Sequence, residues 1–164
     1  MPVPLNANRR LSRPRVGAER GAALIELAVT LPLLMLLVVG TIDFGRVFKT
    51  ANVVTNAARA GALYGARTLT NSVDNAGMIA RANAVLTANN LATGATPTVS
   101  RVCRCYDNNA NAVGGAVACT ASCTGSHMVI DVTVTASRTF TMLGSFPGIP
   151  SSVTLTRSHT MRAQ

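Results

Sequence analysis

Four cysteines, Cys103, Cys105, Cys119 and Cys123, are the residues whose type and spacing point most directly to chemistry. They lie in the part of the chain that is expected to be exported from the cytoplasm. An even number of cysteines in such an oxidising compartment predicts a disulfide framework. A Cys103–Cys105 bridge would close a strained, very small ring, so two pairings stay open: 103–119 with 105–123, or 103–123 with 105–119. A zinc site is the alternative, but zinc favours C-x₂₋₄-C spacing, which the C-R-C at Cys103 lacks. We therefore expect disulfides and no metal.

The other candidate groups form no catalytic arrangement. His127 and His159 stand alone in the sequence, Asp107 lies in a turn-like loop, and Asp131 falls on the polar face of a predicted strand. The sequence contains no G-x-S-x-G motif, no phosphate-binding glycine loop and no paired-carboxylate motif. We therefore expect neither an enzyme nor a cofactor.

Positive charge is concentrated at the N-terminus. The formal net charge is +9, and residues 1–21 contain five arginines: Arg9, Arg10, Arg13, Arg15 and Arg20. Nucleic-acid binding usually needs a basic stripe with stacking aromatic residues, and the later positive charges are scattered singly. We therefore expect no nucleic-acid partner.

An apolar segment follows at residues 22–42, reading AALIELAVTLPLLMLLVVGTI. As a helix it would be about 31 Å long, close to the hydrocarbon thickness of a bilayer. A cleaved signal peptide usually has a shorter apolar region and a small-residue cleavage site, and a buried core helix is usually shorter too. The positive-inside rule then predicts a single transmembrane helix with residues 1–21 as a cytoplasmic leader and the C-terminal part exported.

Glu26 interrupts the apolar segment near its basic end. A carboxylate at mid-membrane costs about 2.5–3.5 kcal/mol on insertion scales. Glu26 could lie one turn into the membrane and reach the headgroups, favoured by the helix N-terminal dipole. Alternatively, it pairs with a positive group in an assembly.

The helix is predicted to continue as a stalk over residues 43–66, because apolar residues recur there at helical spacing, Phe44 and Phe48 among them. Ala57, Gly61 and Gly65 are small residues spaced four apart on one face, which allows close helix packing. This face is expected to pack either against the chain's own C-terminal domain or against another subunit.

Residues 67–164 read as an exported α+β domain. A second helix is predicted over residues 73–89, capped by Asn71 and Ser72, with Ala76, Ala80 and Ala84 as a stripe beside Ile79 and Leu86. Alternating residues predict a strand from Met128 to Ser137, with further strands at residues 99–106 and 152–161. A turn is expected to start at residues 140–142, before a loop at residues 145–150. The fold class is therefore α+β: a long transmembrane and stalk helix, a second helix and a small antiparallel sheet with disulfides.

The stretch RGAALIELAVTLPLLMLLVVGTIDFGRVF, followed by NAARAGALYGA, resembles the TadE-like family of tight-adherence pseudopilins. Gly21 is followed by four apolar residues and then Glu26, as in prepilin-type leaders. The apolar segment contains the sequence L-P-L-L, and it is followed by an acidic residue, Asp43, and by the dipeptide G-R. The A-A-R-A-G segment lies further on, at residues 57–61. The Thr-rich C-terminal segment is more loosely similar.

The resemblance implies cleavage by a prepilin peptidase between Gly21 and Ala22, with Glu26 setting the register between subunits. It further implies a minor pilin-like subunit of a tight-adherence type IVb pilus and secretion apparatus, in the bacterial inner membrane, that supports pilus assembly, adhesion and biofilm formation. Its partners would be the membrane, other pilin-like subunits and the Tad assembly machinery. The alternative function is a permanently anchored, exported binding module that is neither processed nor polymerised.

Overall fold

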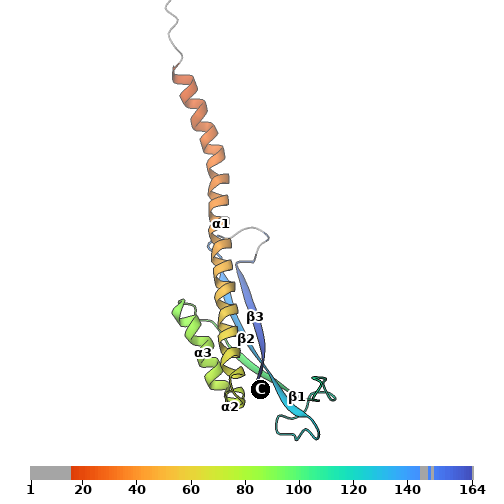
Figure 1. Cartoon of the computed structure of the whole chain (residues 1–164). Coiled ribbons are helices and arrows are strands. Elements are labelled where there is room, and N and C mark those ends of the chain that lie inside the picture. The colour runs from red at the N-terminus through yellow and green to blue at the C-terminus, as the bar shows by residue number, and fades with distance from the viewer. Residues whose placement is uncertain (1–15, 145–147, 149, 164) are drawn as a thin grey trace, which may run out of the picture. The chain divides into compact units, whose positions relative to one another are not determined.

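A computed structural model describes residues 16–144, 148 and 150–163, with side chains from residue 21 onward. Residues 1–15 of the predicted leader and most of the loop predicted over residues 145–150 therefore lie outside the described residues. The chain forms two compact units, divided between Gly40 and Thr41, called here the N-terminal unit and the C-terminal unit. Helix α1, Val16–Ala66, is one continuous element of 51 residues (Figure 1).

The N-terminal unit consists of the apolar part of α1. Its most apolar 18-residue window has a mean hydropathy of 2.5, and none of it is buried against other parts of the chain. A core helix of a soluble protein would be covered by its own chain, whereas this helix leaves its leucines exposed. Length, composition and exposure together support a single-pass membrane protein.

Pro32 lies inside this apolar helix. Proline has no N–H, so the carbonyl of Ala28 loses its usual helical donor at this point. Close by, the Thr30 hydroxyl donates to the carbonyl oxygens of Glu26 and Leu27, at 3.0 and 3.3 Å. Hydroxyl bonds of this kind satisfy backbone groups where water is absent, as in lipid.

The C-terminal unit contains the rest of α1 and all other elements. Two short helices, α2 (Leu69–Val73) and α3 (Asn75–Ala88), precede three strands, β1 (Thr98–Tyr106), β2 (His127–Thr141) and β3 (Ser152–Ala163). The sheet is antiparallel with the order β1-β2-β3, so β2 is central. The predicted α+β fold, with a long apolar helix and a small antiparallel sheet, is confirmed.

Strand β2 supplies one wall of the core. Ile130, Val132, Val134 and Ala136 alternate along the strand and are buried, as their spacing predicted. They pack with α1 and α3 in one cluster, in which small side chains are frequent; its helical members are Val53, Val54, Ala57, Ala58, Ala62, Met78, Ala82 and Leu86. Small residues let the helix backbones approach closely, which suits a chain without tryptophan.

Several sequence predictions about this unit were wrong in detail. The helix predicted over residues 73–89 is α3, which is capped by Asp74 in place of Asn71 and Ser72, and the sequence analysis missed the short helix α2 before it, which is capped by Thr68. The alanine stripe at Ala76, Ala80 and Ala84 is exposed, and the buried stripe is Met78, Ala82 and Leu86. The larger Met78 side chain gains more from burial than an alanine does, which sets the rotation of α3.

The end of β2 also differs from the expected turn at residues 140–142. Strand β2 continues to Thr141, and the Phe140 ring is buried. The strand persists because Phe140 pairs with Val153 of β3 and so extends the ladder. The long β2–β3 pairing brings the end of β2 beside α1, near Asp43.

Candidate functional site

Gly21, Ala22 and Glu26 lie on the exposed surface of the apolar helix. A Cβ placed on Gly21 would meet nothing within 4 Å. Glu26 makes no side-chain hydrogen bond or ion pair within the part of the chain that the structure describes. A carboxylate in this position therefore has nothing from its own described chain to offset the cost of entering a membrane.

Ala57, Gly61 and Gly65 pack inside the C-terminal unit. A Cβ on Gly61 would come within 2.9 Å of the Met78 carbonyl oxygen and 3.0 Å of Val134 Cγ1. A Cβ on Gly65 would come within 2.5 Å of Met78 Sδ and 3.0 Å of Val132 Cγ1. This face therefore joins α1 to α3 and β2 of the same chain, which is the first of the two arrangements considered from the sequence.

Asp43 fastens the end of β2 to α1. Its side chain is buried, and its carboxylate accepts hydrogen bonds from the backbone N–H groups of Leu143, at 3.0 and 3.2 Å, and Gly144, at 3.3 Å. Arg46, one turn further along α1, donates to the same carboxylate at 3.0 Å. A carboxylate with several donors satisfies a buried charge, so we call this set the Asp43 clamp.

The cysteines form two disulfides, Cys103–Cys119 and Cys105–Cys123. This is one of the two connectivities that the sequence left open, and it commits the four sulfurs to bridges in place of zinc. Isolated bridges from β1 to Val117 and Ala112 hold the intervening loop beside the same strand. The loop is therefore fixed to β1 covalently and by backbone pairing.

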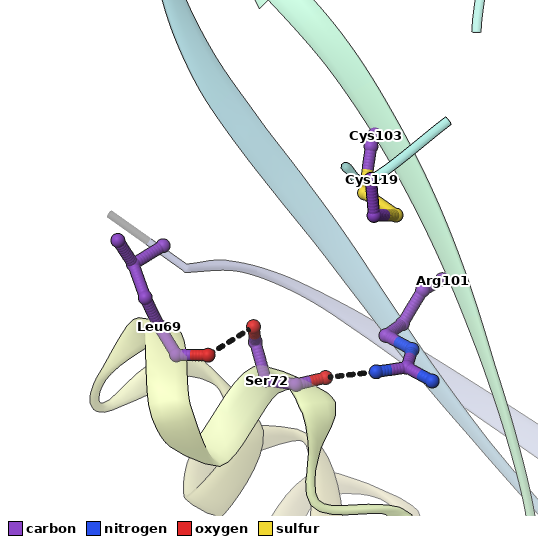
Figure 2. Close-up of a disulfide and its surroundings, with 5 residues drawn as sticks. All are labelled: Leu69, Ser72, Arg101, Cys103 and Cys119. Atoms are coloured by element: carbon purple, nitrogen blue, oxygen red, sulfur yellow. Dashed lines mark hydrogen bonds between the residues drawn. A yellow bond between two sulfur atoms is a disulfide. The ribbon is translucent and has the colours of Figure 1, made fainter. Parts of the chain in front are cut away.

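Strand β1 is also tied to the short helix α2. Figure 2 shows the Arg101 guanidinium donating to the Ser72 carbonyl, at 3.2 Å, close to the Cys103–Cys119 bridge. The Ser72 hydroxyl in turn donates to the Leu69 carbonyl, at 2.6 Å. Ser72, which is fully buried, is thus satisfied on both its hydroxyl and its carbonyl.

Tyr64 and Asp74 form a second polar contact between α1 and α3. The Tyr64 hydroxyl donates to Asp74 Oδ2 at 2.9 Å, while Asp74 Oδ1 accepts the Gly77 N–H at 2.9 Å. The Gly77 and Tyr64 hydrogen bonds hold the pKa of the Asp74 carboxyl below its ordinary value. The bond to Asp74 raises the pKa of Tyr64 for the converse reason. Asp74 is therefore both a helix cap and the acceptor that orients Tyr64.

From the sequence, Asp43 and Arg46 were noted only as the acid and the G-R of the TadE-like resemblance. Their spacing of three on a helix was a usable signal for an ion pair. The partners at Leu143 and Gly144 are 100 residues away in sequence and contribute backbone groups, so no side-chain pattern marks them. Asp74 carried a usable signal too, since aspartate before a helical stretch is a preferred cap.

Comparison with protein families matches residues 21–63 to the TadE-like protein family. No curated protein and no solved structure matches the chain. The matched residues include Gly21, Glu26, the Asp43–Arg46 pair and Gly61. Residues 21–63, from the predicted cleavage site to the packed glycine face, therefore match the TadE-like protein family, the family that the motifs of this segment resemble.

Proposed function

We propose that this protein is a minor pilin-like subunit, or pseudopilin, of a tight-adherence pilus and secretion apparatus. Its part would be structural and not catalytic, in pilus assembly, adhesion and biofilm formation. The TadE-like segment supports this role. The observation that carries it is the Glu26 carboxylate, exposed on an apolar helix and without a partner in the described chain.

The proposed topology places α1 in the bacterial inner membrane, with the N-terminus in the cytoplasm and the C-terminal unit in the periplasm. The arginines before the apolar segment support it through the positive-inside rule. A periplasm-specific reporter fused after Gln164 should be active, and the same reporter fused after Arg15 should be inactive. The reverse pattern would refute the topology.

Cleavage by a prepilin peptidase between Gly21 and Ala22 would remove all five leader arginines and create a charged amine at Ala22. In the same chain, Glu26 lies about 6 Å from Ala22 along the helix axis. When subunits stack with an axial offset, Glu26 of one subunit could meet the Ala22 amine of another. Each charge would then have a partner, and the correct register would be favoured over others.

Mass spectrometry of the protein from its native host tests the processing step. The expected mature chain begins at Ala22. Gly21→Leu should block cleavage and leave the full-length chain in the membrane, whereas Gly17→Leu, four residues earlier in the leader, should be processed normally. An intact N-terminus near Met1 in the unmodified protein would refute processing.

The charge at Glu26 is tested separately by assembly with other pilin-like subunits. Glu26→Ala should insert into the membrane at least as well as the natural chain, because it removes a carboxylate from the apolar segment. Its co-purification with pilin-like subunits should fall, and Glu26→Asp should restore part of it. Unchanged co-purification of Glu26→Ala would contradict the register role.

A permanently anchored binding module is the second candidate, and one residue favours it. Leu27 follows Glu26, whereas prepilin-type sites of this group often have Phe or Tyr there. Replacing Leu27 with Phe separates the two candidates. If the natural chain is unprocessed and Leu27→Phe is cleaved after Gly21, the protein is an anchored module that has lost its processing signal.

A further inference from the structure

A hollow lined with basic residues lies on the C-terminal unit, where α1 passes the end of β2. Its volume is about 210 Å³, and its lining residues are Arg46, Lys49, Thr50, Leu91, Arg138, Thr139, Phe140 and Thr141. We call it the basic hollow. It is smaller than the roughly 300–1,000 Å³ pockets that hold drug-sized ligands, so it suits a small group such as a phosphate.

Three cations, Arg46, Lys49 and Arg138, line the basic hollow, and its lining contains no carboxylate. Arg46 is paired with Asp43, and its guanidinium lies over the Phe140 ring, 5.0 Å from the ring centroid. Arg138 Nη1 donates to the carbonyl oxygens of Leu91 and Thr93, which are neutral acceptors. Both arginines are thereby held in place while other N–H donors of each guanidinium remain available for a ligand.

Lys49 is the third cation and the only lysine in the sequence. It is exposed and makes no hydrogen bond or ion pair with the residues that the structure describes. The lining therefore has an excess positive charge that the described residues do not neutralise. A small group carrying negative charge is the ligand that this arrangement fits.

The position along α1 indicates where such a ligand would come from. The apolar segment ends at Ile42, so Arg46 lies about 6 Å and Lys49 about 10 Å further along the helix axis. The headgroup layer on each side of a bilayer is roughly 5–7 Å thick, and lysine side chains extend toward it along apolar surface. Arg46 and Lys49 of the basic hollow thus lie within about 10 Å, along the helix axis, of the end of the apolar segment, close to where a headgroup layer would begin.

Exposed apolar side chains occur at the same level of α1 as the basic hollow, outside its lining. Phe44 and Phe48 on α1 are 75% and 62% exposed, and Leu143, held by the Asp43 clamp, is 66% exposed. Large apolar side chains at this level are typical of residues that lie in a membrane interface. They indicate a membrane interface around this part of α1, which would present phosphate as a lipid headgroup and not as a free ion.

We propose that the basic hollow binds the phosphate of an anionic phospholipid in the leaflet that faces the C-terminal unit. Arg46, Lys49 and Arg138 surround the phosphate, while Phe44, Phe48 and Leu143 contact the apolar part of the same leaflet. The bound lipid holds the domain against the membrane at a fixed height. This inference rests on the membrane anchoring in the proposed function.

Native mass spectrometry of the full-length chain in a non-ionic detergent tests the inference. Phosphatidylglycerol, phosphatidylcholine and inorganic phosphate are titrated separately. One phosphatidylglycerol should bind at least fivefold more tightly than phosphatidylcholine, whose choline group cancels the phosphate charge.

Lys49→Gln should weaken phosphatidylglycerol binding about fivefold, since one basic residue near a lipid surface contributes about 1 kcal/mol. Arg59→Gln removes an exposed positive charge from the same helix, away from the hollow, and should have no effect.

Equal binding of the two lipids would overturn the inference. An equal loss of phosphatidylglycerol affinity in Lys49→Gln and Arg59→Gln would overturn it too, because the lipid would then respond to the overall charge of the chain and not to a defined site. Displacement of phosphatidylglycerol by an equal concentration of inorganic phosphate would identify a soluble anion as the ligand and overturn it as well. Membrane fractionation separates this failure from failure of the proposed anchoring. A chain absent from the membrane fraction contradicts the anchoring, whereas an inserted chain that does not distinguish the lipids contradicts only the lipid site.

Discussion

Gly61 of α1 lies so close to Met78 of α3 that a Cβ on Gly61 would come within 2.9 Å of the Met78 carbonyl oxygen. The oxygen belongs to the backbone, so it cannot move aside as the end of a flexible side chain can. We expect Gly61→Leu to lower the free energy of unfolding by about 1–3 kcal/mol or more through overpacking. Thermal unfolding of the detergent-solubilised chain, followed by near-ultraviolet circular dichroism, measures this.

Gly45 provides the matched control for that prediction. It lies on the same helix, but a Cβ there meets nothing within 4 Å. Gly45→Leu should change the free energy of unfolding little, or raise it slightly, because leucine favours a helix more than glycine does. Equal destabilisation by the two substitutions would show that close approach at Gly61 is unimportant.

The two disulfides predict a specific pattern of protease sensitivity. Replacing both Cys105 and Cys123 with serine should make the loop over residues 107–115 a cleavage site, because the loop loses one of the two covalent bridges that enclose it. Each bridge closes a loop with a sequence separation of 16 or 18 residues, worth about 3 kcal/mol in the chain-entropy model. Limited proteolysis with peptide mapping measures the cleavage rate. A rate equal to that of the natural chain would contradict the prediction.

Asp74 predicts a loss of stability in acid. In the folded chain the pKa of its carboxyl is below 3.8, and in the unfolded chain it returns to the ordinary value. The unfolded state therefore binds more protons between those two values, so stability falls as pH drops through them. Asp74→Asn keeps a good helix cap but does not titrate, so its stability should change less with pH in this range. Part of the acid sensitivity should remain, because hydrogen bonds from Asn111 and Asn109 also lower the pKa of Asp107.

The Asp43 clamp predicts that one substitution on α1 loosens a distant strand end. In Asp43→Ala the backbone N–H groups of Leu143 and Gly144 lose their acceptor. Their hydrogen exchange should accelerate about tenfold or more, since bonds to a charged group contribute about 1.5–3 kcal/mol. Asp131→Ala, which removes the exposed pair with Arg162, is the control and should leave those two amides unchanged. Unaltered exchange in Asp43→Ala would mean that the clamp does not hold the strand end.

The parts of the fold that the sequence predicted are those in which one physical signal dominates. The alternation in β2 and the long apolar run each produce a pattern that no other structure explains as well. Helix α3 is different, because alanine occurs all around it, so the stripe of Ala76, Ala80 and Ala84 was as regular as the buried one. Only the size of Met78 and Leu86 separates the two faces.

The candidate sites divide in the same way. The disulfides followed from the number and location of the cysteines, but their connectivity needed the position of the loop beside β1. The basic hollow combines residues 46–50 with residues 138–141, which only the long β2–β3 pairing brings to the same end of α1. No local pattern in either segment predicts the other.

The disulfides also determine how this domain would respond to a pulling force. Between Cys103 and Cys123 the chain has about 20 residue steps, roughly 70 Å when fully extended. While the Cys105–Cys123 bridge is intact, a shorter path runs from Cys103 to Cys105 along the chain and then across the bridge to Cys123. The bridge spans a Cα–Cα distance of 5.6 Å, so the whole path is about 13 Å long. A subunit stretched between its helix and its last strand would therefore yield about 55 Å less extension while oxidised than after reduction. Oxidation state therefore sets how far this domain can lengthen under tension once its fold has opened.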